Sequence, residues 1–298
     1  NDMGRIRGMT SYGAYINEGT MANEEVFNEI KARCSGEGAR ILVDTNPDQP
    51  EHWLKTNYID KADGKVIQSY HFKLDDNTFL TDRYKDNIKA ATPTGMFYDR
   101  DIEGLWVSAE GIVYKDFRKE THYIKSKDLK DINFVKYFAG VDWGYEHPGA
   151  IVVLGRDDKG DTYLLEEHSK QYEEIEYWVN VAKEIKKRYG NIGFYCDTAR
   201  PEHIKRFKKE NIKAINGDKS RLAGIGEVAR LIKLEKFKVV YDKVDLFKKE
   251  IFMYSWNKAT GEPLKIWDDV LDAIRYAIYT ESIKKTIGVG SKSKLGIR

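Results

Sequence analysis

Residues 137–144 read YFAGVDWG, an aromatic and β-branched run that predicts a buried strand with one acid, Asp142, near its end. After a turn, residues 150–154 read AIVVL and predict a second strand. The sequence DDKG at 157–160 is typical of a tight hairpin and leads into a third strand, TYLL at 162–165. The chain order therefore predicts three sequential antiparallel strands.

Beyond these strands the hydrophobic period changes from that of a strand to that of a helix. Apolar residues recur at helical spacing on one face of a segment, namely Ile175, Trp178, Val179, Ala182 and Ile185. Further strands are expected at 192–197, 213–216 and 237–241, and helices from 201, at 222–234, at 244–256 and at 268–283. The result is an α/β domain with a mixed sheet that begins in βββαβαβα order.

The sequence before this domain is also mixed α/β. Strands are expected at 13–18 and 39–44, and helices at 24–33 and 81–91. We divide the chain into a first domain (1–100), an ordered connector (101–125), a second domain (126–285) and a flexible basic tail rich in Gly, Ser and Lys (286–298). Because the first residue is Asn, we expect the chain to be the later part of a longer polypeptide.

Composition excludes several classes of protein. Of the 298 residues, 41% are hydrophobic and 33% are charged, which argues against disorder. No apolar run approaches the roughly 20 residues of a spanning helix, and no signal segment is present, so we expect an intracellular protein without a membrane partner. Two cysteines, Cys34 and Cys196, exclude a disulfide scaffold. The net charge is only +2, so nucleic-acid affinity must come from local patches.

Acidic residues stand where strands end or where the last helix begins. Asp142 and Asp197 end apolar strands, and the last helix carries Asp268, Asp269 and Asp272. Clustered carboxylates need a cation, and oxygen ligands favour Mg²⁺ or Mn²⁺. Each acid also has an ordinary interpretation: a strand Asp is often satisfied by backbone N–H groups or an Arg, and Asp268 could be a helix N-cap.

A basic run lies between residues 203 and 221, close after Asp197. Its members are Lys205, Arg206, Lys208, Lys209, Lys213, Lys219 and Arg221. Such a run is often only a solvated helix face, but beside a metal site it would neutralise DNA phosphates. We therefore assign DNA binding to Lys205, Arg206, Lys208, Lys209, Lys219 and Arg221.

Three motifs together resemble the nuclease domain of the large terminase subunit of tailed bacteriophages. They are VDWGYEHP at 141–148, YCDTARP at 195–201 and WDDVLDAIRYA at 267–277. The resemblance implies an RNase H-like fold with Asp142, Asp197 and Asp272 as catalytic metal ligands and Asp269 as a fourth ligand. It also implies two Mg²⁺ or Mn²⁺ ions as cofactors, in a two-metal mechanism of phosphodiester hydrolysis.

The first domain is similar to the end of the terminase packaging ATPase. GAYINE at 13–18 resembles the Walker B strand and DTNP at 44–47 the coupling motif, which implies an ATPase remnant formed by Asn17, Glu18, Thr45 and Asn46. No G-x-x-x-x-G-K-[ST] motif occurs, so the ATPase-type domain is incomplete. We expect no ATP hydrolysis from this chain, and ATP binding only with a P-loop supplied upstream.

The resemblance implies a metal-dependent endonuclease that cuts double-stranded concatemeric viral DNA during packaging, in the cytoplasm of the bacterial host. Its implied partners are double-stranded DNA, the small terminase subunit and the portal protein. Two alternatives stay open: another RNase H-like nuclease or resolvase, and a truncated, non-catalytic product that binds DNA or partner subunits. The ATPase-like motifs argue against the first alternative.

Overall fold

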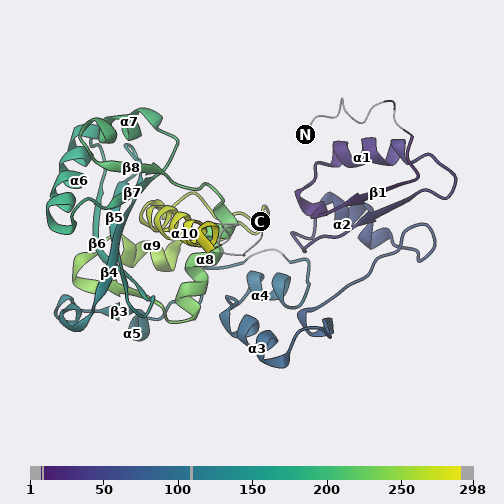
Figure 1. Cartoon of the computed structure of the whole chain (residues 1–298), viewed down its shortest axis with the longest axis horizontal. Coiled ribbons are helices and arrows are strands. Elements are labelled where there is room, and N and C mark those ends of the chain that lie inside the picture. Colours follow the sequence, from purple (N-terminus) through teal and green to yellow (C-terminus); the bar gives the residue numbers. More distant parts are fainter. Residues whose placement is uncertain (1–7, 9, 108–109, 290–298) are drawn as a thin grey trace, which may run out of the picture. The chain divides into compact units, whose positions relative to one another are not determined.

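The computed structural model describes residues 8, 10–107 and 110–289, and the chain forms two compact units (Figure 1). Unit 1 comprises Asn1–Glu110 and Asn257–Glu262, and unit 2 comprises Gly111–Trp256 and Pro263–Arg298. Among the described helices, none has an apolar stretch long enough to cross a membrane.

Unit 1 is built on two parallel strands, β1 (Gly13–Ile16) and β2 (Arg40–Val43). Phe27, whose ring packs against those of Trp53 and Tyr58, is buried in its core. The helices are α1 (Glu24–Arg33), α2 (Trp53–Asn57), α3 (Asp82–Ala91) and α4 (Met96–Asp101), with short 3₁₀ turns η2 (Gly19–Met21), η3 (Ile59–Lys61) and η4 (Leu74–Asp76).

Unit 2 is built on a seven-stranded mixed sheet in the order β3-β9-β6-β5-β4-β7-β8. The predicted antiparallel trio is confirmed as β4, β5 and β6, and the other pairings are parallel. The strands are β3 (Tyr123–Ile124), β4 (Phe134–Asp142), β5 (Gly149–Asp157), β6 (Thr162–Lys170), β7 (Gly193–Cys196), β8 (Lys213–Asn216) and β9 (Phe237–Val240).

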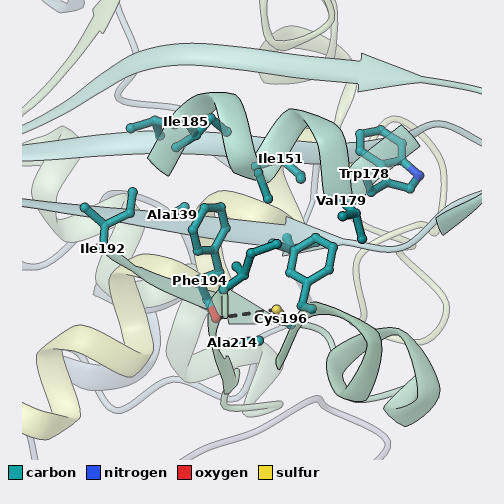
Figure 2. Packing of buried hydrophobic residues seen from close by; sticks show 14 of the residues in the cluster. Ala139, Ile151, Trp178, Val179, Ile185, Ile192, Phe194, Cys196 and Ala214 are labelled. Atoms are coloured by element: carbon teal, nitrogen blue, oxygen red, sulfur yellow. Dashed lines mark hydrogen bonds between the residues drawn. The ribbon is translucent and has the colours of Figure 1, made fainter. Parts of the chain in front are cut away.

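Helices cover both faces of this sheet (Figure 1). They are α5 (Lys119–His122), α6 (Ile175–Tyr189), α7 (Pro201–Lys209), α8 (Arg221–Lys233), α9 (Phe247–Met253) and α10 (Asp269–Val289), with 3₁₀ turns η5 (Ser126–Asp131) and η6 (Tyr241–Lys243). On one face, Trp178, Val179 and Ile185 of α6 pack against Ile151 and Phe194 of the strands, as Figure 2 shows. This confirms the apolar face predicted for α6.

The opposite face of β4 receives α10. Successive side chains of a strand alternate between faces. Ala139 and Val141 therefore face α6 and α7, whereas Gly140 and Asp142 face α10. A Cβ at Gly140 would lie 1.9 Å from the carbonyl oxygen of Ala273, so only glycine lets α10 approach this strand so closely. The close approach brings the acids of α10 to the strand that ends in Asp142.

Three boundaries differ from the sequence-based expectation. Helix α9 is shorter than the predicted 244–256 because Val244 and Tyr254 have extended backbone. The predicted connector 101–125 contributes β3, since Tyr123 and Ile124 pair with β9. Helix α10 extends to Val289, into the segment expected to be a flexible tail. The rest of that tail, 290–298, lies outside the described residues.

Candidate active site

Strand register places two of the predicted catalytic acids at one edge of the sheet. Val141 of β4 pairs with Cys196 of β7 in parallel, so Asp142 and Asp197 both follow a paired position at the same edge. The backbone N–H of Asp197 donates to the carbonyl oxygen of Val141 at 2.9 Å. The first turn of α10 adds Asp272 on the face to which Asp142 points.

The site contains more acidic side chains than basic side chains to neutralise them. The pKa of Asp142 is raised well above its ordinary value, first by burial and then by the carboxylates of Asp272, Asp197, Asp269 and Asp268. Like charges disfavour ionisation in this way only when they are close to one another. A bound cation would relieve both effects, which is the electrostatic signature of a metal site.

Each neighbouring carboxylate already has a cationic or polar partner. Asp272 forms a bidentate pair with Arg275, from Nε to Oδ1 at 3.1 Å and from Nη2 to Oδ2 at 2.9 Å. Asp197, only 8% exposed, accepts a hydrogen bond from Tyr276 at 3.3 Å and lies 3.7 Å from Nζ of Lys219. These groups hold the carboxylates in defined directions.

Asp268 stands at the N-cap position of α10, where its carbonyl oxygen accepts from the backbone N–H of Asp272 at 2.6 Å, but its carboxylate is directed to Arg221 and not to the N–H groups of Val270 and Leu271. Its Oδ2 lies 3.1 Å from Nη2 of Arg221. Burial and the two neighbouring acids, Asp272 and Asp269, raise the pKa of Asp268 to about 6, against the opposing effect of Arg221. The helix N–H groups therefore need another acceptor.

That acceptor is Glu250 of α9, which sequence reasoning missed. Its Oε2 accepts from the backbone N–H groups of Val270 at 2.9 Å and Leu271 at 3.1 Å. Glu250 is fully buried, and burial raises its pKa to about 9. In the sequence, this role of Glu250 could have been found from its position three residues after Phe247, on the apolar face of a short helix.

Two other residues near the acids were also missed or undervalued. The turn residue His147, to which we gave no role, has its Nδ1 2.7 Å from Oδ1 of Asp269. Arg275 is only 3% exposed, and a Cβ at Gly224 would lie 2.7 Å from its side chain, so a glycine on α8 makes room for it. A charged residue between Ile274 and Tyr276 in an apolar run was the sequence signal.

The donor atoms fit a hard divalent cation, although the side chains as placed do not enclose one. Carboxylate oxygens of Asp142, Asp197, Asp269 and Asp272 are the ligands that Mg²⁺ and Mn²⁺ prefer. Among residues 8, 10–107 and 110–289, however, no three His, Cys, Asp or Glu side chains form a group that could hold an ion. Arg275 contacts both oxygens of Asp272, so an ion would share this carboxylate with the guanidinium through the remaining lone pairs of its oxygens.

The basic run divides into three groups in the structure. Lys219 and Arg221 lie at the site, paired with Asp197 and Asp268. Arg206 is neutralised instead by Glu176 and Glu210, which makes it a structural residue. The remaining lysines are exposed and form no ion pair within the described ranges: Lys205, Lys208, Lys209 and Lys213.

The parallel pairing of β1 and β2 also brings the predicted ATPase remnant together. Nδ2 of Asn46 donates to Oε2 of Glu18 at 3.3 Å. Thr45 accepts at Oγ1 from the backbone N–H of Thr20 at 2.9 Å, which joins the two loops. Asn17, by contrast, meets only the hydroxyl of Tyr15, at 3.4 Å, and does not contact Glu18 through its side chain.

Known proteins resemble the chain over nearly its whole length. Residues 1–120 match the family described as the N-terminal part of the terminase large subunit, T4likevirus-type. The large terminase from a thermophilic bacteriophage has a TM-score of 0.83 and 29% identity, with 93% of this chain and 70% of that one covered. The structure of the same terminase in complex with ATP-γ-S has a TM-score of 0.80 and 29% identity, and the match covers 91% of this chain and 70% of that one. The P22 large terminase nuclease domain has a TM-score of 0.48 and 20% identity, and the match covers 58% of this chain and 97% of that one. No curated protein matches.

The fold and the matches define a mixed α/β chain whose second unit is built on a seven-stranded mixed sheet and which shares the fold of a phage large terminase. The match of residues 1–120 to the terminase family and the likeness of the chain to a large terminase over 93% of its length support a large terminase subunit of a bacteriophage with a role in genome packaging, as the sequence motifs indicated.

Proposed function

We propose that the chain is a metal-dependent endonuclease that cuts double-stranded concatemeric viral DNA during packaging. The observation that carries the proposal is the meeting of Asp142, Asp197 and Asp272 at one sheet edge, where burial and then the neighbouring carboxylates raise the pKa of Asp142. Buried carboxylates gathered in this way cost stability, and groups with strongly shifted pKa values concentrate at functional sites.

Asp142, Asp197 and Asp272 would hold two Mg²⁺ or Mn²⁺ ions, with Asp269 as a further ligand. Ions at such a site lower the pKa of a water and stabilise charge on the leaving oxygen of a phosphodiester. Tyr276 and the backbone of β4 fix the direction of Asp197. His147 orients Asp269. Lys219, released from Asp197, would bind the phosphate next to the one that is cut.

The exposed lysines of α7 extend this basic surface away from the acids. Lys205, Lys208 and Lys209 would contact the DNA backbone without reading its sequence. We further propose that ATP binding needs a P-loop outside this chain, and that the enzyme acts with the small terminase subunit and the portal protein in the host cytoplasm.

Cleavage of supercoiled plasmid in Mn²⁺ or Mg²⁺, with an EDTA control, tests the proposal. Asp142→Asn should reduce cleavage at least about 100-fold, because removing a ligand removes the charge that positions an ion. The variant should melt at or above the wild-type temperature in EDTA, since a repelled carboxylate is gone. Wild-type cleavage by the folded variant would refute the assignment.

A non-catalytic, DNA-binding product is the second candidate. The bidentate pair between Arg275 and Asp272 favours it, because it occupies both oxygens of a proposed ligand. If the purified chain binds DNA but does not cleave plasmid in either metal, this candidate replaces the first.

A further inference from the structure

A groove of about 570 Å³ opens on unit 2 and is lined mainly by polar and basic side chains. We call it the basic groove. Its lining includes Lys170, Lys248, Lys249, Pro148, Gln171 and Asp245. No lysine of this groove belongs to the basic run at 203–221.

Strand register places the basic groove at the same sheet edge as the acids. Asp142 pairs with Ala150 across β4 and β5, and the neighbouring Gly149 pairs with Lys170 at the end of β6. The backbone of Lys170 is therefore two strands from Asp142, about 10 Å at the usual strand spacing, and its side chain extends on the α6 side of this edge, where Nζ lies 4.8 Å from the ring centroid of Tyr177. Gln171, which follows it, donates from Nε2 to the carbonyl oxygen of Glu146 at 2.9 Å.

Helix α9 forms the other wall of the groove and is held by hydrogen bonds at both ends. Glu167 of β6 accepts from the backbone N–H groups of Leu246 at 2.9 Å and Phe247 at 3.0 Å, which holds the start of α9. One turn later Glu250 binds the first turn of α10. Lys248 and Lys249 are therefore held between β6 and the helix that carries Asp272.

The charges of the groove are available to a ligand. Lys249 is exposed and has no ion pair among the described residues. Lys248 lies 3.6 Å from the fully exposed Asp245, and Lys170 lies 2.5 Å from Glu173 in a half-exposed pair. Surface pairs of this kind contribute little free energy, so a phosphate can displace them.

We propose that the basic groove binds the DNA backbone on the side of the acids opposite to Lys219; this rests on the proposed nuclease function. In the sheet order β6-β5-β4-β7, the groove strand β6 and the Asp197 strand β7 lie on opposite sides of β4. A duplex centred on Asp142 meets Lys219 on one side and Lys170, Lys248 and Lys249 on the other. The groove therefore sets DNA affinity, and the acids set cleavage.

The test measures binding of a 30-base-pair duplex in EDTA, where cleavage is absent, across a salt series. The variant is the triple Lys170→Ala, Lys248→Ala, Lys249→Ala. The matched control replaces three exposed lysines next to η5, before the start of β4 and so at the opposite end of that strand from Asp142: Lys125→Ala, Lys127→Ala and Lys130→Ala. We expect the groove variant to bind at least about tenfold more weakly, with the slope of log K against log salt reduced by about 2–3, and the control to match wild type.

An equal change in both variants, or an unchanged salt slope in the groove variant, would overturn the proposal. Lys249→Glu is measured alongside, because its exposed side chain can change without affecting folding, and it should weaken binding while its melting temperature stays at the wild-type value. The nuclease proposal fails separately, if wild type binds this duplex but cuts no plasmid in Mn²⁺. Absence of binding by wild type refutes the groove directly.

Discussion

At the scale of residues, three acids near the start of α10 face different partners. Asp268 meets Arg221, Asp269 meets His147, and Asp272 meets Arg275 on the face that receives β4. We therefore expect cleavage to fall most in Asp272→Ala, less in Asp269→Ala and least in Asp268→Ala. The last change should alter the melting temperature in EDTA little, because loss of the pair with Arg221 opposes relief of the burial and repulsion that raise the pKa of Asp268.

Cleavage rates over a Mn²⁺ titration, with thermal melts of the three variants, measure this order. Since Asp142→Asn keeps the helix acids, it serves as the inactive reference. An inactive Asp268→Ala beside an active Asp272→Ala would require the ligand roles to be reassigned.

The buried Glu250 predicts a dependence of stability on pH. Its folded pKa is about 9, raised from an ordinary value near 4.5 chiefly by burial. A raised pKa means that the neutral acid stabilises the fold below pH 4.5, and that this contribution is lost as the pH rises towards 9. Glu250→Gln keeps an oxygen acceptor for the N–H groups of α10 but cannot ionise.

We therefore expect the Glu250→Gln variant to melt near the wild-type temperature at pH 5 and about 5 °C or more above it at pH 8.5. Melts in EDTA over pH 5–9 measure the difference. Glu250→Ala is the comparison variant, and it should be less stable than wild type at pH 5 because the N–H groups lose their acceptor. Parallel melting curves for wild type and Glu250→Gln would contradict the assignment.

At the scale of elements, the packing of α10 against β4 depends on the absence of a side chain at Gly140. Gly140→Ala would place a Cβ 1.9 Å from the carbonyl oxygen of Ala273, so the helix must move. Overpacking of this kind costs about 1–3 kcal/mol. We expect a lower melting temperature and a loss of cleavage together, because the same helix carries Asp272.

Gly193→Ala is the matched control for this change. Gly193 is also a strand glycine of the same sheet, but its Cβ would lie 3.1 Å from the terminal Cδ1 of Ile215, which can move, and in ordinary contact at 3.8 Å with the ring end of Tyr195. A Gly140→Ala protein with wild-type melting and cleavage would show that α10 has more freedom than the packing indicates.

At the scale of the whole molecule, we propose that the two units carry different parts of a packaging enzyme. Unit 1 places Glu18 beside Asn46 but supplies no P-loop sequence to hold a nucleotide. We expect ATP hydrolysis by the purified chain to equal that of its Glu18→Gln variant, while plasmid cleavage is retained by both. Phosphate release above the variant's level would show that nucleotide is held by other residues.

Local pattern alone predicted much of this molecule. The antiparallel trio, the alternation of strands and helices and the apolar face of α6 were all readable, because periods of two and of 3.6 residues report which side chains are buried. The sequence also indicated Asp142 and Asp197, because acids at the ends of apolar strands stand out against their neighbours, and Asp272, which belongs to a cluster of acids at the start of the last helix.

Partners distant in the chain were decided only by the tertiary structure. The side-chain cap of α10 comes from Glu250, about 20 residues earlier, and not from the adjacent Asp268. Arg206 is neutralised by Glu176, 30 residues before it, which a count of charges within the basic run does not include. The basic groove combines Lys170 with Lys248, which only the packing of α9 against β6 brings together. Charge pairing and capping depend on distance in space, so sequence determined which elements form, and packing determined which side chains meet.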